Sequence, residues 1–84
     1  MEILIATLQD SGYRLTAQRM YIIAHLWEST IITNIDEIYI KLRLKKRISW
    51  ATVYSTIKLL YDLGWLSLTV GEGSVRQYRW ARRK

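Results

Sequence analysis

The chain has 84 residues, 50% of them hydrophobic, no cysteine and a formal net charge of +6 at pH 7. This length predicts one small domain, residues 1–84, which buries only about 60% of the surface that its unfolded form exposes, and the lack of cysteine excludes a disulfide framework or a thiolate metal site. No apolar run approaches the ~20 residues of a membrane span, and Glu2 replaces the basic start of a secretory signal, so we expect a cytoplasmic protein.

A short helix is predicted at the N-terminus of the chain. It covers residues 2–9, with Ile5 and Leu8 facing inward. Ser11 and Gly12 follow it, and this pair is typical of a helix end and a turn.

Two further helices are predicted from their N-terminal caps. Thr16 can cap the second helix, and Asn34 with Glu37 three residues later forms a capping-box pattern for the third. The apolar stripes that we expect to be buried are Met20, Ile23, Ala24 and Trp27 on the second helix and Ile35, Ile38, Tyr39 and Leu42 on the third.

Residues 48–66, ISWATVYSTIKLLYDLGWL, predict a fourth helix with two different faces. Ser49 can cap its start, and Gly64 can end it because glycine accepts the left-handed conformation of a C-terminal cap. The side chains on one face are short and polar enough for that face to enter a DNA groove. We expect Trp50, Val53, Ile57 and Leu60 on the buried face and Ala51, Ser55, Lys58 and Asp62 on the opposite one.

The C-terminal part of the chain predicts a β-hairpin. Its strands cover about residues 65–70 and 75–80, and the sequence GEGS between them has the composition of a turn. Leu66, Leu68 and Val70 alternate with Ser67 and Thr69, so we expect the first three to face inward. The order of elements predicts a mainly α fold with a small β-hairpin, a winged helix in which a helix-turn-helix precedes a two-stranded wing.

The positive charge is concentrated in the second half of the chain. Through Ile40, two arginines oppose five carboxylates, for a net charge of −3, whereas from Lys41 onward eleven Lys or Arg oppose two carboxylates, for +9. This distribution indicates a domain that binds a polyanion. The alternative is that these are the solvated basic loops and tails common on soluble proteins.

Two motifs resemble the ferric uptake regulator family of winged-helix repressors. ATVY at Ala51–Tyr54, followed by LL-Y-D-LGWL, is similar to the family's recognition helix, and GYRLTAQR at Gly12–Arg19 is similar to its entry into the second helix. The resemblance covers nearly the whole chain but only the family's N-terminal DNA-binding domain; no counterpart of its C-terminal metal-sensing and dimerisation domain is expected in these 84 residues. It implies a sequence-specific regulator of transcription that binds double-stranded DNA, A/T-rich by analogy, with a weak or DNA-induced dimer left open.

A protein-interaction module is the alternative function, because winged helices also serve in protein assemblies. An exposed apolar patch that includes Trp50 or Tyr61 would favour this reading, whereas clustered cations beside the fourth helix favour DNA.

The N-terminal part of the fourth helix carries the candidate base contacts. A helix fits the major groove, short side chains permit close approach, and Tyr54 offers a hydroxyl and a ring for thymine methyl groups. The resemblance matches Tyr54 to the family's recognition tyrosine, although a half-buried structural tyrosine is an equal alternative. The family usually has arginine next, where this chain has Ser55, which implies a different operator. The candidate contacts on this helix are Ser49, Ala51, Thr52, Tyr54, Ser55 and Lys58.

Basic residues outside that helix are candidate backbone contacts. Arg14 matches the position where the family carries a basic residue for an A/T-rich minor groove, a role that suits a guanidinium; a solvated loop arginine is the alternative. Arg19 lies in the first turn of a helix, where a cation opposes the dipole, so a phosphate contact would explain it better. The remaining candidate phosphate contacts are Lys45, Lys46, Arg47, Arg76, Arg82, Arg83 and Lys84.

No metal, cofactor or enzymatic activity is expected. The family's ligand histidine before the third helix corresponds to Ile31 and Ile32, and its glutamate at the end of the second wing strand corresponds to Arg79. His25, the only histidine, has the sequence environment of an ordinary surface residue. The glycines of GEGS lie between strands rather than at a helix start, and Asp36 is adjacent to Glu37 and so on a different side of its helix, so neither a phosphate loop nor a catalytic carboxylate pair is indicated.

Overall fold

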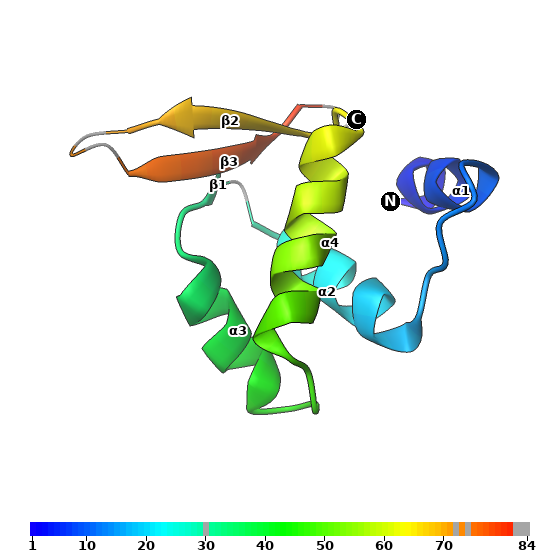
Figure 1. Ribbon diagram of the computed structural model, residues 1–84, viewed down its shortest axis with the longest axis horizontal. Coiled ribbons are helices and arrows are strands. Elements are labelled where there is room, and N and C mark those ends of the chain that lie inside the picture. The colour runs from blue at the N-terminus through cyan, green and yellow to red at the C-terminus, as the bar shows by residue number, and fades with distance from the viewer. Residues whose placement is uncertain (30, 72, 74, 82–84) are drawn as a thin grey trace.

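Helix α4 (Trp50–Asp62) forms the centre of the computed structural model, which describes residues 1–29, 31–71, 73 and 75–81 (Figure 1). Helix α4 contacts α2, α3 and strand β2. The sheet lies at the C-terminal end of α4, and α3 and α1 lie on opposite sides of α4. None of the described helices is long and apolar enough to cross a membrane. The other elements are α1 (Glu2–Asp10), α2 (Ala17–Trp27), β1 (Ile31–Ile32), α3 (Ile35–Arg43), β2 (Leu66–Val70) and β3 (Arg76–Trp80).

The three predicted N-terminal caps are confirmed. The side-chain oxygens of Thr16, Asn34 and Ser49 each accept a hydrogen bond from the backbone N–H three residues later, at 3.2 Å in every case. Each bond satisfies one of the N–H groups that a helix start leaves unpaired, a contribution of about 1 kcal/mol per cap. The starts of α2, α3 and α4 are therefore fixed by local sequence.

The buried face of α4 follows the predicted stripe from its second turn onward. Val53, Ile57 and Leu60 are buried as predicted, but Trp50 is 43% exposed, so its predicted inward position is wrong. Trp50 is the first residue of the helix and its indole N–H donates to a carboxylate oxygen of Asp36 on α3, at 2.7 Å. An indole N–H needs a hydrogen-bond partner, and Asp36 supplies one at the surface, so the Trp50 side chain remains there.

Helix α2 buries a different stripe from the predicted one. Met20 and Ala24 are exposed, whereas Ile22, Ile23 and Leu26 are fully buried. Consecutive apolar residues on this helix supply two overlapping helical stripes, and only packing against the other elements selects between them. The prediction is correct for Ile23 and wrong for Met20 and Ala24.

Burial on α1 is shifted from the predicted residues, and α3 buries less than its sequence suggested. On α1, Leu4 and Leu8 are buried and Ile5 is half-buried. On α3 only Leu42 is buried, and the rest of its predicted stripe is half-buried. The core comprises Leu4, Leu8, Ile22, Ile23, Leu26, Ile32, Leu42, Ile48, Val53, Ile57, Leu60, Trp65 and Leu66.

The sheet has three antiparallel strands in the order β1-β3-β2, one more than the sequence predicted. Strand β1 has two residues and pairs Ile31 with Arg79 and Ile32 with Tyr78 on β3. A strand this short has no alternation from which it could be recognised. It closes one edge of the wing and places Ile32 in the core.

The wing extends beyond the core. Leu66 is buried, Leu68 is half-buried and Val70 is 67% exposed, so the predicted inward position of Val70 is wrong. The backbone N–H of Gly71 donates to the carbonyl of Val75 at 2.7 Å and continues the hairpin pairing. Two residues of the predicted turn, 72 and 74, lie outside the described residues.

The base of the wing is attached to α2. The indole N–H of Trp80 donates to the backbone carbonyl of Leu26 at 3.0 Å, and the ring of Trp80 meets that of Trp27 edge to face at 4.8 Å. These contacts join β3 to the C-terminal end of α2, so the wing and α4 are held in one unit.

Gly64 provides a test of the helix end. Its φ is +82° and an added Cβ would meet no atom within 4 Å, so Gly64→Ala should cost only backbone strain, about 1–2 kcal/mol of unfolding free energy. Gly64→Asn should cost less, because asparagine tolerates the left-handed region better. Urea unfolding of both variants measures this, and equal stability of Gly64→Ala and the parent would contradict it.

Candidate nucleic-acid interface

Most of the outward face of α4 is open to solvent, as the sequence pattern predicted, although Ser55 on that face is half-buried. Ala51 and Lys58 are exposed, and Tyr54 is 42% exposed. The ammonium of Lys58 lies 3.5 Å from a carboxylate oxygen of Asp62 one turn later, in an ion pair whose two side chains are more than half exposed. Such pairs contribute little to stability, so Lys58 can exchange its partner for another anion.

The hydroxyl groups on α4 are used within the helix itself. Ser49 Oγ lies 2.8 Å from Thr52 Oγ1, and the Ser55 hydroxyl donates to the Thr52 carbonyl at 3.2 Å. Thr56 is fully buried and donates to the same carbonyl at 2.7 Å. The candidate contacts Ser49, Thr52 and Ser55 are therefore held in fixed positions by bonds within or next to the helix.

Trp50 and Tyr54 form an aromatic pair at the N-terminal end of α4. Their rings are stacked, with centroids 5.2 Å apart and planes at 15°. The hydrogen bond from Trp50 to Asp36 links this pair to the first turn of α3. Sequence reasoning placed Trp50 in the core and missed the pair; the available signal was a tryptophan at the first helical position, four residues before an outward-facing tyrosine.

The aromatic pair lines a groove between α3, α4 and the wing. Asp36 from α3 and Arg76 and Tyr78 from β3 line the same groove. Two of the predicted contacts, Tyr54 and Arg76, are thus brought to one place. The ring of Tyr54 and the guanidinium of Arg76 there can contact bases and phosphates.

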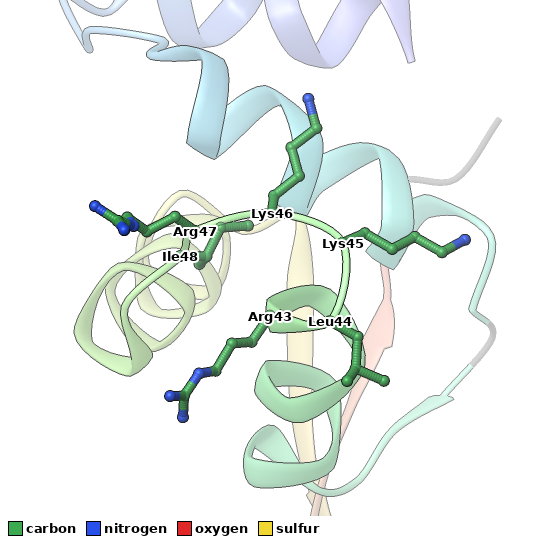
Figure 2. A pocket seen from close by; sticks show the side chains of 6 residues that line it. All are labelled: Arg43, Leu44, Lys45, Lys46, Arg47 and Ile48. Atoms are coloured by element: carbon green, nitrogen blue, oxygen red, sulfur yellow. The ribbon is translucent and has the colours of Figure 1, made fainter.

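Four cations, here called the basic turn, lie at the end of α3 and in the connection to α4: Arg43, Lys45, Lys46 and Arg47. These residues, with Leu44 and Ile48, line a shallow depression (Figure 2). The charged ends do not converge: Lys45, Lys46 and Arg47 point in different directions. This arrangement does not form a cradle for one small anion, but it suits several phosphates along an extended backbone.

Contacts with neighbouring helices fix the basic turn. The amide of Gln18 near the start of α2 donates to the Arg47 carbonyl at 3.1 Å. The ammonium of Lys46 lies 5.2 Å from the centroid of the Tyr21 ring, within range of a cation–π interaction. Lys46 and Arg47 therefore lie beside the first half of α2.

The two N-terminal arginines are less closely tied to this surface. Arg14 is exposed in the connection between α1 and α2, and no hydrogen bond or ion pair within the described part of the chain joins its side chain to α4. Arg19 is half-buried in the first turn of α2, where its backbone N–H bonds to Thr16. The predicted contacts at residues 82–84 lie outside the described residues.

The positions of the expected family metal ligands are neighbours but carry no ligand chemistry. Ile31 is the cross-strand partner of Arg79, and Ile32 is 1% exposed in the core. A hydrocarbon and a guanidinium cannot replace imidazole and carboxylate ligands. Within residues 1–29, 31–71, 73 and 75–81, no three His, Cys, Asp or Glu side chains lie close enough to hold a metal ion. These residues do not fit a metal at this place.

The comparison with protein families decides the identity of the domain. Residues 10–84 match the Ferric uptake regulator family. The chain belongs to this family. Fur-family proteins are DNA-binding regulators of transcription rather than enzymes, so the predicted family, the winged-helix fold and the non-enzymatic class are confirmed.

Individual relatives share only part of their length with the chain. The "Peroxide-responsive repressor PerR" of Staphylococcus epidermidis is 39% identical over 74 residues, which are 86% of this chain and 49% of that protein. PerR of Staphylococcus aureus (strain USA300) is 38% identical over 74 residues, 86% of this chain and 50% of that protein. The chain thus spans about half the length of these relatives.

Solved structures of the family superpose closely on the domain. The ferric uptake regulator Fur of Helicobacter pylori has a TM-score of 0.75 and 26% identity, covering 99% of this chain and 56% of that one. PerR from Streptococcus pyogenes has a TM-score of 0.77 and 29% identity, covering 94% of this chain and 55% of that one.

Proposed function

We propose that this Fur-family domain binds double-stranded DNA sequence-specifically, with the N-terminal half of α4 in the major groove, and that it represses transcription without sensing metal. The observation that carries this is the exposed aromatic pair at the start of α4, in one groove with Arg76 and next to the basic turn. A helix end with exposed rings can reach base edges, and cations on both sides can hold the two phosphate backbones.

Base and phosphate contacts divide between these residues. Tyr54 and Ala51, on the open face of α4, are the base-reading residues of this proposal, and a ring and a methyl group favour thymine methyl groups. Lys46, Arg47 and Arg76 hold phosphates. Because one domain of this size buries little DNA-facing surface, we expect it to bind weakly and to pair, if at all, on a palindromic duplex.

Arginine and lysine variants test the assignment of these roles. If Arg14 enters a narrow A/T-rich minor groove, Arg14→Ala should weaken binding to duplexes with A/T-rich flanks by about 1 kcal/mol more than to those with G/C-rich flanks. Lys46→Ala should weaken both duplexes equally and reduce the salt slope by about one contact, because a phosphate carries no sequence information. Fluorescence anisotropy with the two labelled duplexes measures both effects.

The two variants control for each other, because each removes one positive charge. Equal losses for Arg14→Ala on both flanks would make Arg14 a general anchor. Unchanged binding by both variants would show that the DNA-binding surface is not on this side of the domain.

Metal should have no effect on this domain. Adding zinc, iron(II) or manganese should change neither the melting temperature nor the DNA affinity, since the family ligand positions hold Ile32 and Arg79. A ligand that binds the folded state raises its stability by mass action. A clear rise in melting temperature with one equivalent of metal would therefore contradict the proposal, and Mg²⁺ at the same concentration is the control for ionic strength.

A protein-interaction module is the second candidate, and exposure favours it at two places. Trp50 and Tyr61 are 43% and 42% exposed, and Ile40 on α3 and Leu44 just after it are 57% and 81% exposed. These side chains could be buried by a protein partner. Such a partner would not explain the cations of the basic turn, and binding to duplex DNA separates the two functions.

A further inference from the structure

Tyr54 is held by a chain of two contacts that ends on another helix. Its ring stacks on Trp50 within α4, and the indole of Trp50 donates to Asp36 at the start of α3. The 2.7 Å bond is short for a nitrogen donor, as expected when the acceptor is a carboxylate. Without this link, both rings would be free to change rotamer, since each is more than two-fifths exposed.

The position of Asp36 is unfavourable for a surface that meets DNA. Its carboxylate lines the same groove as Tyr54 and Arg76, and a negative charge there repels phosphate. The first turn of α3 favours an acidic residue, but Glu37 next to it already supplies one. Asp36 therefore needs another role that outweighs this repulsion, and its hydrogen bond to the Trp50 indole supplies one, because that bond orients the Trp50 ring.

We propose that Asp36 and Trp50 are positioning residues that set the sequence preference of the domain by fixing the Tyr54 ring before DNA arrives. This inference rests on the proposed function, in which Tyr54 reads bases. A ring that is already ordered avoids the loss of side-chain freedom on binding, and it meets only the base step that matches its fixed position. Trp50 also extends the apolar surface beside Tyr54 toward the same bases.

Removing the Asp36 carboxylate should change two measured quantities in opposite directions: the affinity for a duplex of unrelated sequence rises, and the preference for one sequence falls. A preferred duplex is first selected from a random library with the unmodified chain, and a scrambled duplex of the same composition is the reference. Asp36→Ala should bind the scrambled duplex more tightly, because a repulsive charge is gone, yet its preference for the selected duplex should fall about two- to tenfold, the cost of ordering one side chain.

Asp36→Asn is the matched control for Asp36→Ala. It removes the same charge but keeps an oxygen that accepts from the indole. It should therefore gain the same affinity for the scrambled duplex and keep the original preference. Trp50→Phe, which retains a ring but has no N–H, should lose preference as Asp36→Ala does, and the double variant should lose no more than either single one.

A structural role for the Asp36–Trp50 bond would give a different result. If the bond only joins α3 to α4, the melting temperature of Asp36→Ala falls but its preference, measured well below that temperature, stays at the parent value, and the inference is wrong. Equal loss of preference in Asp36→Asn and Asp36→Ala would also overturn it. If the unmodified chain binds no duplex, or binds selected and scrambled duplexes alike, the proposed function itself fails.

Discussion

Raising the monovalent salt concentration from about 50 to about 200 mM should weaken duplex binding by about two orders of magnitude. Each phosphate contact displaces about 0.9 counterion, so about four contacts from the basic turn, Arg76 and the N-terminal arginines give a slope near −3.6 on logarithmic axes. Anisotropy titrations of a labelled duplex at several salt concentrations measure this slope. It is the largest effect that we expect, because several phosphate contacts contribute to it together.

The same titrations separate the two candidate functions. If the duplex affinity does not change with salt, or if no duplex binds at the lowest salt concentration, the result favours a protein partner bound by the exposed side chains of α3 and α4. Circular dichroism at each salt concentration is the control, because a change in folding would also change binding.

Tyr54→Ala should cost about 1–3 kcal/mol on a preferred duplex and much less on a random one, because base contacts specify a sequence and phosphate contacts do not. Tyr61→Ala is the matched control. Both tyrosines are 42% exposed on α4, but Tyr61 lies two turns further along and contacts Tyr78 edge to face at 6.0 Å. We expect its preference for the selected duplex to equal that of the parent.

Two results would contradict the base-reading role of Tyr54. Equal losses on preferred and random duplexes would make it a general anchor, and an equal effect of Tyr61→Ala would indicate nonspecific loss of aromatic surface. Both variants must first give the melting curve of a folded domain, since Tyr54 also stacks on Trp50.

Local signals in the sequence were sufficient for most of the fold. The caps at Thr16, Asn34 and Ser49 and the positive φ of Gly64 depend on neighbouring residues only, and these boundaries were predictable. The buried face of α2 was not, because its apolar residues fit two stripes and the choice depends on contacts with other elements. Strand β1 depends entirely on pairing with the distant strand β3.

Some residues of the candidate site could be named from the sequence, but their arrangement could not. The sequence indicated a cluster of cations before α4 and left Tyr54 either base-contacting or half-buried; its side chain is 42% exposed. It contained no sign that Asp36 and Trp50 meet, since they lie on different helices and their contact depends on the angle between those helices. Whether the cations of the basic turn converge also depends on backbone path, which composition does not determine.

The position of Trp50 gives the domain an intrinsic optical probe. Trp65 is buried and Trp27 and Trp80 are half-buried, so Trp50, at 43% exposure, is the indole most open to solvent. An added quencher such as iodide or acrylamide should reach its emission first. Fluorescence from this ring therefore reports on events in the groove without any attached dye, while the other three indoles report mainly on the integrity of the core.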